Sequence, residues 1–411
     1  MIPQISSLNY TPILTIIRES VQLVLSNWSE TKTNRMKTAV RTTQKLLTFL
    51  IFNLIVVAVI FLLIEGLASF ILFFQAIAGT PPVAERTHTQ YDAELGWVNR
   101  PDVYIENMYG PGLDLETNAQ GFRNDEDFGE TVPTGQLRVI CSGDSFTLGY
   151  GVDNDHTWCQ RLAALDNRLQ TVNMGQGGYG VDQAYLWYKR DGTTLAHDIH
   201  LFTFITNDFE RMRSDSFLGY GKPVLDVQDG RLVVGNVPVP ERAFYVPWLT
   251  QNSESLKKLK TVQLLSGLFQ NSAQAETNNQ LTQNDWLLER VNVGILQDLQ
   301  QLNRDQNSLL VLVYLPTLND YQPDPQGDTE QWRQKVRLAA QDLGIPFIDL
   351  IEEFRMLPAS DVPALFLREG EVDFPGAAGH YTVSGNDYIA QRLYEQLTAL
   401  PEVAGRLADV Q

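Results

Sequence analysis

Short hydrophobic runs recur along the chain from residue 136 onward, separated by longer amphipathic stretches. The runs are rich in β-branched and aromatic residues, which favours buried strands. The intervening stretches place apolar residues at helical spacing. The runs lie at 136–141, 170–174, 199–205, 308–315 and 346–350, and the helical stretches at 157–166, 182–190, 285–303, 331–343 and 384–397. Strands that alternate with crossover helices predict an α/β domain with a parallel sheet and helices on both faces.

The longest apolar run has a different character. Residues 46–64 carry no charge and one Asn, which matches the length needed to cross a bilayer. Apolar residues continue past Glu65, so we expect a helix over 46–78 with Glu65 near an interface. Five basic residues lie just before the run, and the positive-inside rule then places the N-terminus in the cytoplasm. We predict a signal-anchor in the inner membrane, with the following domain in the periplasm.

Four regions follow from these patterns. Residues 1–45 form a basic cytoplasmic segment, in which 13–25 have the spacing of an amphipathic helix. Residues 46–78 form the transmembrane anchor. Residues 79–133 are rich in Gly, Asn, Pro and Asp and are predicted to be a stalk and an irregular cap. Residues 134–402 form the α/β domain, with an insertion at about 210–284 that contains a hairpin turning at Asp229 and Gly230.

Charge and cysteine usage narrow the function. The net charge is −18, while residues 1–45 are basic, so the remainder of the chain is strongly acidic and repels nucleic acid. The two cysteines, Cys141 and Cys159, form no metal-ligand or redox motif. We expect two buried free thiols, and a single disulfide is the alternative for a domain outside the cytoplasm. His88, His156, His197 and His200 have no metal-like spacing and are expected on the surface or in loops.

Four residues with possible chemistry lie where strands end. Ser145 follows the first strand, Gly178 the second and Asn207 the third, and His380 precedes the last helix. Ligands of open parallel sheets bind beyond the carboxyl ends of the strands, so these positions should meet. A serine hydroxyl becomes nucleophilic when an imidazole accepts its proton. The backbone N–H groups of Ser145 and Gly178 and the amide of Asn207 would stabilise the oxyanion of acyl transfer.

The motifs carry a family resemblance. GDSFTLGYGV (143–152), NMGQGGYG (173–180), TNDF (206–209) and GHYTVSGN (379–386) resemble the four motif blocks of the SGNH (GDSL-like) hydrolase superfamily. The segment GFRND and the anchor are similar to a bacterial membrane-bound branch associated with surface polysaccharides. The resemblance implies a flavodoxin-like three-layer α/β/α fold, no metal and no cofactor, and a structural role for Asp144.

The position of the catalytic acid departs from the family pattern. The family usually places a carboxylate two or three residues before the histidine, and here those positions are Ala378 and Ala377. Asp373, or Glu371, is one candidate to orient the imidazole. A backbone carbonyl that leaves a Ser145–His380 dyad is the second alternative, and a catalytically weak site is the third. Orientation matters because the wrong tautomer cannot accept the serine proton.

These observations predict a serine esterase or acyltransferase that acts outside the membrane on an acylated glycan, with polysaccharide-assembly proteins as possible partners. A non-catalytic glycan-binding or assembly subunit is one alternative, and a lipid esterase or thioesterase is another. Asp182 is expected to cap a helix. Trp97, Tyr104 and Tyr109 are candidate stacking platforms for a sugar ring.

Overall fold

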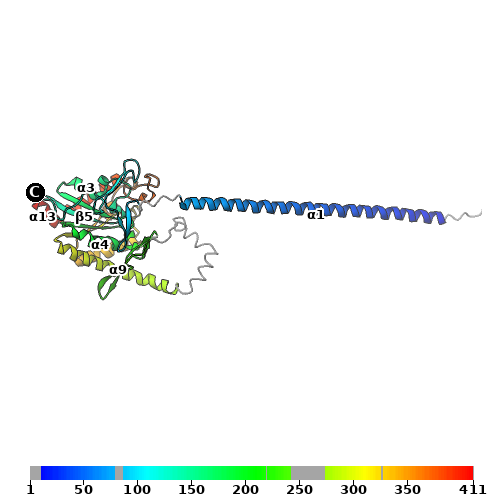
Figure 1. The fold of residues 1–411 in the computed structure, drawn as a ribbon. Coiled ribbons are helices and arrows are strands. Elements are labelled where there is room, and N and C mark those ends of the chain that lie inside the picture. The colour runs from blue at the N-terminus through cyan, green and yellow to red at the C-terminus, as the bar shows by residue number, and fades with distance from the viewer. Residues whose placement is uncertain (1–10, 79–86, 219, 242–273, 325–326, 411) are drawn as a thin grey trace, which may run out of the picture. The chain divides into compact units, whose positions relative to one another are not determined.

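The structure is a computed structural model that describes residues 11–78, 87–218, 220–241, 274–324 and 327–410. The chain divides into two units, Met1–Thr80 and Pro81–Gln411. The first contains one long helix and the second contains the sheet and the remaining helices (Figure 1).

Helix α1 runs from Thr11 to Ala78. Its segment Arg41–Leu67 has a mean hydropathy of 3.1 and is long and apolar enough to cross a membrane. The side chain of Asn53, within the predicted span, donates to the carbonyl of Phe49 at 2.7 Å, so its amide is partly satisfied within the helix. The helix continues past Glu65, as expected. The side chains on which the amphipathic prediction for 13–25 depends, and the stalk at 79–86, lie outside the described residues.

A five-stranded parallel sheet forms the centre of the second unit. Its order is β6-β5-β7-β12-β13, which is the flavodoxin-like order 2-1-3-4-5. This confirms the predicted fold class, and all five predicted strands are present. Their bounds are β5 Leu137–Gly143, β6 Leu169–Gly175, β7 Ile199–Phe204, β12 Leu309–Tyr314 and β13 Phe347–Asp349. The chain reverses its direction of winding between β5 and β7, where a ligand crevice is expected.

Helices cover both faces of the sheet and enclose two hydrophobic cores. Residues of α4, α9 and α10 pack into one core, and residues of α3, α11, α12 and α13 pack into the other. Helix α9 begins earlier than predicted, and α13 was not predicted. The bounds are α3 Trp158–Leu165, α4 Val181–Arg190, α9 Gln274–Asp305, α10 Asp328–Leu343, α11 Leu350–Phe354, α12 Val383–Thr398 and α13 Pro401–Asp409. Figure 1 shows α3 and α4 on opposite sides of β5.

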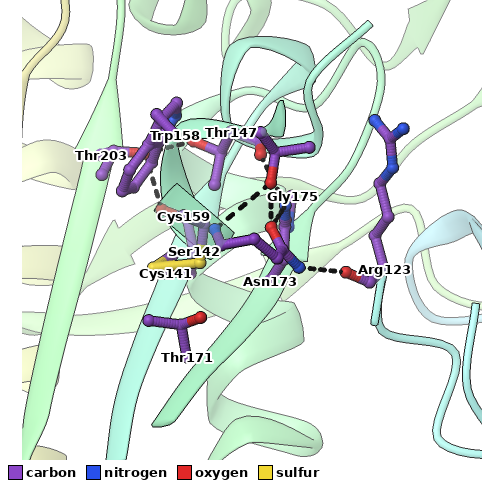
Figure 2. The surroundings of a disulfide bond; sticks show 12 residues. Arg123, Cys141, Ser142, Thr147, Trp158, Cys159, Thr171, Asn173, Gly175 and Thr203 are labelled. Carbon is purple, nitrogen blue, oxygen red and sulfur yellow. Dashed lines mark hydrogen bonds between the residues drawn. A yellow bond between two sulfur atoms is a disulfide. The ribbon is translucent and has the colours of Figure 1, made fainter. Parts of the chain in front are cut away.

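A disulfide joins Cys141 of β5 to Cys159 of α3, with a Cα–Cα distance of 6.3 Å (Figure 2). Both residues are fully buried. The expectation of two free thiols is therefore wrong, because strand and helix pack closely enough to bring residues 18 positions apart into bonding distance. The bond fixes α3 against the strand that leads directly to Ser145.

Four two-stranded antiparallel sheets lie outside the central sheet in the described part of the chain. The predicted hairpin at Asp229-Gly230 is confirmed, since β10 pairs with β11 across those residues. The described part of the chain does not include residues 242–273 of the predicted insertion. The paired strands are β1 Thr89–Asp92 with β2 Gly96–Asn99, β3 Val103–Ile105 with β4 Leu115–Thr117, β8 Ser216–Phe217 with β9 Tyr220–Gly221, and β10 Val224–Gln228 with β11 Arg231–Gly235.

Three of the histidines expected on the surface are buried. His88, His197 and His200 lie in the core, whereas His156 is partly exposed. Two of these imidazoles are hydrogen-bonded in the core: His200 Nε2 lies 2.6 Å from the Ser142 hydroxyl, and His197 Nε2 lies 2.9 Å from the Tyr188 hydroxyl. Burial lowers the pKa of both His197 and His200, so both rings are neutral near pH 7.

Asp182 does not cap α4 through its side chain. Gly180 is the N-cap, and the carboxylate of Asp182 instead accepts from Lys222 Nζ at 2.7 Å. Both side chains are buried. This ion pair ties the inserted segment that carries Lys222 to the start of α4, next to the loop that contains Gly178.

Candidate active site

Ser145, the predicted nucleophile, is the first residue of a short helix. Strand β5 ends at Gly143, Asp144 is the N-cap, and α2 spans Ser145–Leu148. The Asp144 carboxylate accepts from the backbone N–H of Phe146 at 2.8 Å, which fixes the turn. This contact agrees with the structural role that the resemblance implied for Asp144. The hydroxyl of Ser145 is thereby held at the carboxyl edge of the sheet.

The structure brings Ser145 and His380 together across 235 residues of sequence. His380 Nε2 lies 2.8 Å from Ser145 Oγ, a hydrogen-bonding distance suited to proton transfer. The loop that carries His380 is fixed through its backbone. Leu367 N–H donates to the His380 carbonyl at 2.8 Å, and the backbones, not the side chains, of Phe366 and Tyr381 form an antiparallel β-bridge. Thr382 then caps α12 by accepting from Gly385 N–H.

The second nitrogen of the imidazole faces the backbone. His380 Nδ1 lies 3.2 Å from the carbonyl oxygen of Ala377, at the end of the short 3₁₀ turn Pro375–Ala377. A carbonyl accepts and cannot donate, so this contact favours the tautomer with the proton on Nδ1 and a free acceptor at Nε2. That tautomer is the one able to take the proton of Ser145.

The structure does not bring Asp373 to His380. Asp373 is exposed, and its backbone N–H donates to the carbonyl of Tyr109 at 2.9 Å, which directs the chain toward the cap. Glu371 is also exposed and its carboxylate accepts from Arg368 N–H. Within the described residues neither carboxylate bonds the imidazole. Of the three alternatives for the missing acid, the geometry favours the backbone carbonyl.

A buried ionic cluster lies next to Ser145 rather than next to His380. Arg211 Nη1 contacts Asp144 Oδ2 at 3.1 Å, and it also contacts the carboxylate of Asp208. The same nitrogen donates to the carbonyl of Tyr179 at 2.9 Å, beside Gly178. Burial and the neighbouring Asp144 raise the pKa of Asp208 well above its usual range, although Arg211 opposes the shift. Asp144 Oδ2 lies 3.5 Å from Ser145 Oγ, so a carboxyl group lies next to the Ser145 hydroxyl.

These surroundings set the protonation of His380. Burial lowers the pKa of His380 to about 4, while the charge of Asp144 and the carbonyl of Ala377 raise it and only partly offset the burial. His380 is therefore neutral at pH 7 and ready to accept a proton. No group of His, Cys, Asp or Glu side chains in the described part of the chain is arranged to hold a metal ion.

Hydrogen-bond donors suited to an oxyanion are left unused. In the described residues, no acceptor bonds the backbone N–H of Ser145, the backbone N–H of Gly178 or the side-chain amide of Asn207. Asn207 is exposed in the first turn of α5, Thr206–Arg211. Gly178 has φ +76°, and a Cβ at that position would collide with the ring of Phe217, so glycine is required there.

The structure adds one residue that sequence reasoning missed, Arg123, and gives Trp97 a different role from the predicted sugar platform. Arg123, fully buried, donates to the carbonyls of Leu148 and Val152 and to Asn154 Oδ1, and so fixes the loop after α2. Its only signal was its place in GFRND. Trp97 donates from Nε1 to the carbonyl of Gly177 at 2.9 Å.

The aromatic side chains of the cap do not all suit sugar stacking. Trp97 and Tyr109 are buried, and of the three proposed platforms only Tyr104 is exposed. The Tyr104 hydroxyl donates to Asp114 Oδ2 at 2.5 Å. Trp97 packs against Tyr179 and Phe217, and Tyr109 packs against Tyr150 and Phe374. Neither ring therefore presents a free face to a substrate in this conformation.

Comparison with known proteins gives fold-level similarity only. No family model and no curated protein sequence matches the chain. Among solved structures, a member of the lipolytic protein G-D-S-L family from Veillonella parvula is 15% identical with a TM-score of 0.34, covering 64% of this chain and 99% of that one. A lipase/acylhydrolase from Enterococcus faecalis is 13% identical with a TM-score of 0.32, covering 64% and 95%. An acetyl xylan esterase is 13% identical with a TM-score of 0.33, covering 64% and 100%. TM-scores this low carry no argument about activity, which has to come from the geometry of the site.

Proposed function

We propose that the chain is a membrane-anchored serine esterase or acyltransferase in which Ser145 is the nucleophile and His380 the general base. The observation that carries the proposal is the 2.8 Å contact between Ser145 Oγ and a His380 Nε2 that is free to accept a proton. It lies at the reversal point of a flavodoxin-like sheet, where a ligand is expected.

The reaction would proceed in two steps. His380 Nε2 takes the Ser145 proton as the Oγ–carbon bond forms, and the carbonyl π electrons move to the oxygen. The N–H groups of Ser145 and Gly178 and the Asn207 amide then stabilise the oxyanion. Collapse breaks the ester C–O bond, and the leaving alkoxide receives the proton from His380. Water or a sugar hydroxyl next attacks the acyl-enzyme by the same route in reverse.

The substrate we propose is an O-acylated glycan at the cell surface or in export, with O-acetyl as the acyl group. Support comes from the motif resemblance and from the apolar segment Arg41–Leu67 with its basic flank. That flank favours a cytoplasmic N-terminus and a periplasmic domain. The Cys141–Cys159 disulfide agrees with such an oxidising compartment. Polysaccharide-assembly proteins are the partners that this location suggests.

A non-catalytic glycan-binding or assembly subunit is the second candidate, and the absence of a carboxylate at His380 Nδ1 favours it. Hydrolysis of p-nitrophenyl acetate by the full-length chain in detergent separates the two. The esterase proposal expects hydrolysis that Ser145→Ala reduces at least about a thousandfold, since nucleophile and base act as one unit. Equal rates for the wild type and Ser145→Ala would reject it.

A further inference from the structure

The ring of His380 is held by an aromatic neighbour. The imidazole stacks on the phenyl ring of Phe146, with ring centroids 4.4 Å apart and an interplanar angle of 28°. A second ring, Tyr150, lies 5.2 Å away at 55°. Stacked contacts at such distances stabilise a ring pair beyond simple burial.

The backbone contact alone is a weak constraint on the imidazole. A neutral N–H···O bond is best near 2.9 Å, and the Ala377 carbonyl lies at 3.2 Å from Nδ1. A carboxylate would supply a shorter, charge-assisted bond. In its absence, partial rotation about the Cβ–Cγ bond of His380 would tilt the ring plane, weaken the contact between Nδ1 and the Ala377 carbonyl, and move Nε2 out of line with Ser145 Oγ.

Phe146 is itself rigidly placed. Its N–H donates to the Asp144 carboxylate at 2.8 Å, and its carbonyl accepts from Trp158 Nε1 at 3.0 Å. Its ring meets Tyr381 edge-on at 5.0 Å and 77°, so it is held between the residue that follows the base and the base itself. Only 7% of Phe146 is exposed. A fixed ring can fix the plane of another ring stacked on it.

We propose that Phe146, the residue after the nucleophile, is a positioning residue that holds the plane of the His380 imidazole in place of the missing carboxylate. The inference rests on the proposed function. When Nε2 takes the Ser145 proton, the imidazolium forms over the face of the phenyl ring, whose π electrons attract a cation. Phe146 would therefore assist both the orientation of the base and the charge that the base acquires.

The test compares substitutions at two buried phenylalanines in the full-length chain. Phe146→Leu and Phe146→Ala remove the stacking ring, and Phe366→Leu is the matched control. Phe366 packs on Tyr381 at 5.5 Å, but in the described structure it makes no ring contact with His380. We expect kcat for p-nitrophenyl acetate to fall about tenfold in Phe146→Leu and about a hundredfold in Phe146→Ala, with KM changed less than about threefold. Phe366→Leu should keep kcat within about twofold.

A histidine-labelled ¹⁵N spectrum gives a readout that does not need turnover. With five histidines in the chain, the His380 signals are assigned by their loss in His380→Ala. The wild type should show the Nδ1–H tautomer, and Phe146→Ala should show mixed tautomers. Unchanged kcat in Phe146→Ala, or an equal fall in Phe366→Leu, would overturn the proposal. If the wild type hydrolyses no ester, the proposed function fails by itself. The tautomer then decides about Phe146: mixing supports its positioning role and no change rejects it.

Discussion

The two halves of the Ser145–His380 pair are held in different ways. Ser145 follows the buried strand β5 and lies beside the cluster of Asp144, Asp208 and Arg211. The same strand carries Cys141 of the disulfide. His380 lies on a loop and is held by a backbone carbonyl and stacked rings. The comparison shows that a carboxylate able to favour an imidazolium at His380 is present. It is Asp144, which lies beside Ser145 and does not bond His380 Nδ1.

The largest effect should come from removing the cation on the nucleophile side. Arg211→Met leaves Asp144 and Asp208 buried without their counter-ion, so we expect about 3 kcal/mol of lost stability, together with lost activity. Denaturant unfolding in detergent measures the first. Arg337→Met is the control, since the Arg337–Asp349 pair is half exposed on the arginine side and should contribute less than about 1 kcal/mol. Equal losses of unfolding free energy in Arg211→Met and Arg337→Met would show that the buried cluster beside Ser145 stabilises the fold no more than a half-exposed ion pair.

Removing the disulfide should cost nearly as much. Closing a loop of this length stabilises a fold by about 3 kcal/mol in the chain-entropy view, so the Cys141→Ala, Cys159→Ala double variant should unfold at lower denaturant. Reductant should shift the wild type toward the same midpoint and leave the variant unchanged. If reductant breaks the disulfide but leaves the denaturation midpoint of the wild type unchanged, the bond does not stabilise the packing of α3 on β5.

Acidification should weaken the fold before it protonates the base. Burial lowers the pKa of His197, His200 and His380 in the folded chain, whereas the unfolded chain binds these protons near pH 6.5. The stability is therefore complete above about pH 6.5 and falls as the pH drops, by up to about 1.4 kcal/mol per pH unit for each histidine. Thermal unfolding between pH 7 and 5 measures the slope, and His197→Gln should make it shallower. A flat profile over that range would contradict the burial of neutral histidines.

The smallest effect is expected at the carboxylates of the base loop. Asp373→Asn and Glu371→Gln should keep kcat/KM for p-nitrophenyl acetate within about twofold of the wild type, because neither side chain contacts the imidazole. A loss of about a hundredfold or more in Asp373→Asn, comparable to losing a catalytic acid, would show that the loop rearranges to form a triad.

The sequence was sufficient for the sheet but not for the orientation of the base. Hydrophobic runs such as 308–315 predicted the strands because burial on both faces leaves a continuous apolar pattern. The approach of Ser145 to His380 was expected from the strand end at which Ser145 lies and from the motif resemblance that includes His380. The route of 371–380 depends on contacts with the cap, such as Asp373 N–H to the Tyr109 carbonyl, which no local pattern contains.

The buried polar groups were missed for a related reason. His200 is neutral in the core because Ser142 and Asn303, 58 and 103 residues distant, provide its hydrogen bonds. Arg123 is buried because carbonyls of the loop after α2 converge on it. Hydrogen bonds between residues so far apart leave no periodic pattern in the sequence. A polar residue that is buried in the fold therefore cannot be told from a surface residue by its sequence neighbours.

The pH dependence of Ser145 labelling by a fluorophosphonate probe tests the central claim most directly. If His380 takes the serine proton without a carboxylate, labelling of the wild type should rise through a single pKa near 4, provided the chain is still folded there. His380→Ala should abolish that rise and lower the rate at pH 7 at least about a hundredfold. Labelling of His380→Ala at the wild-type rate would contradict the account.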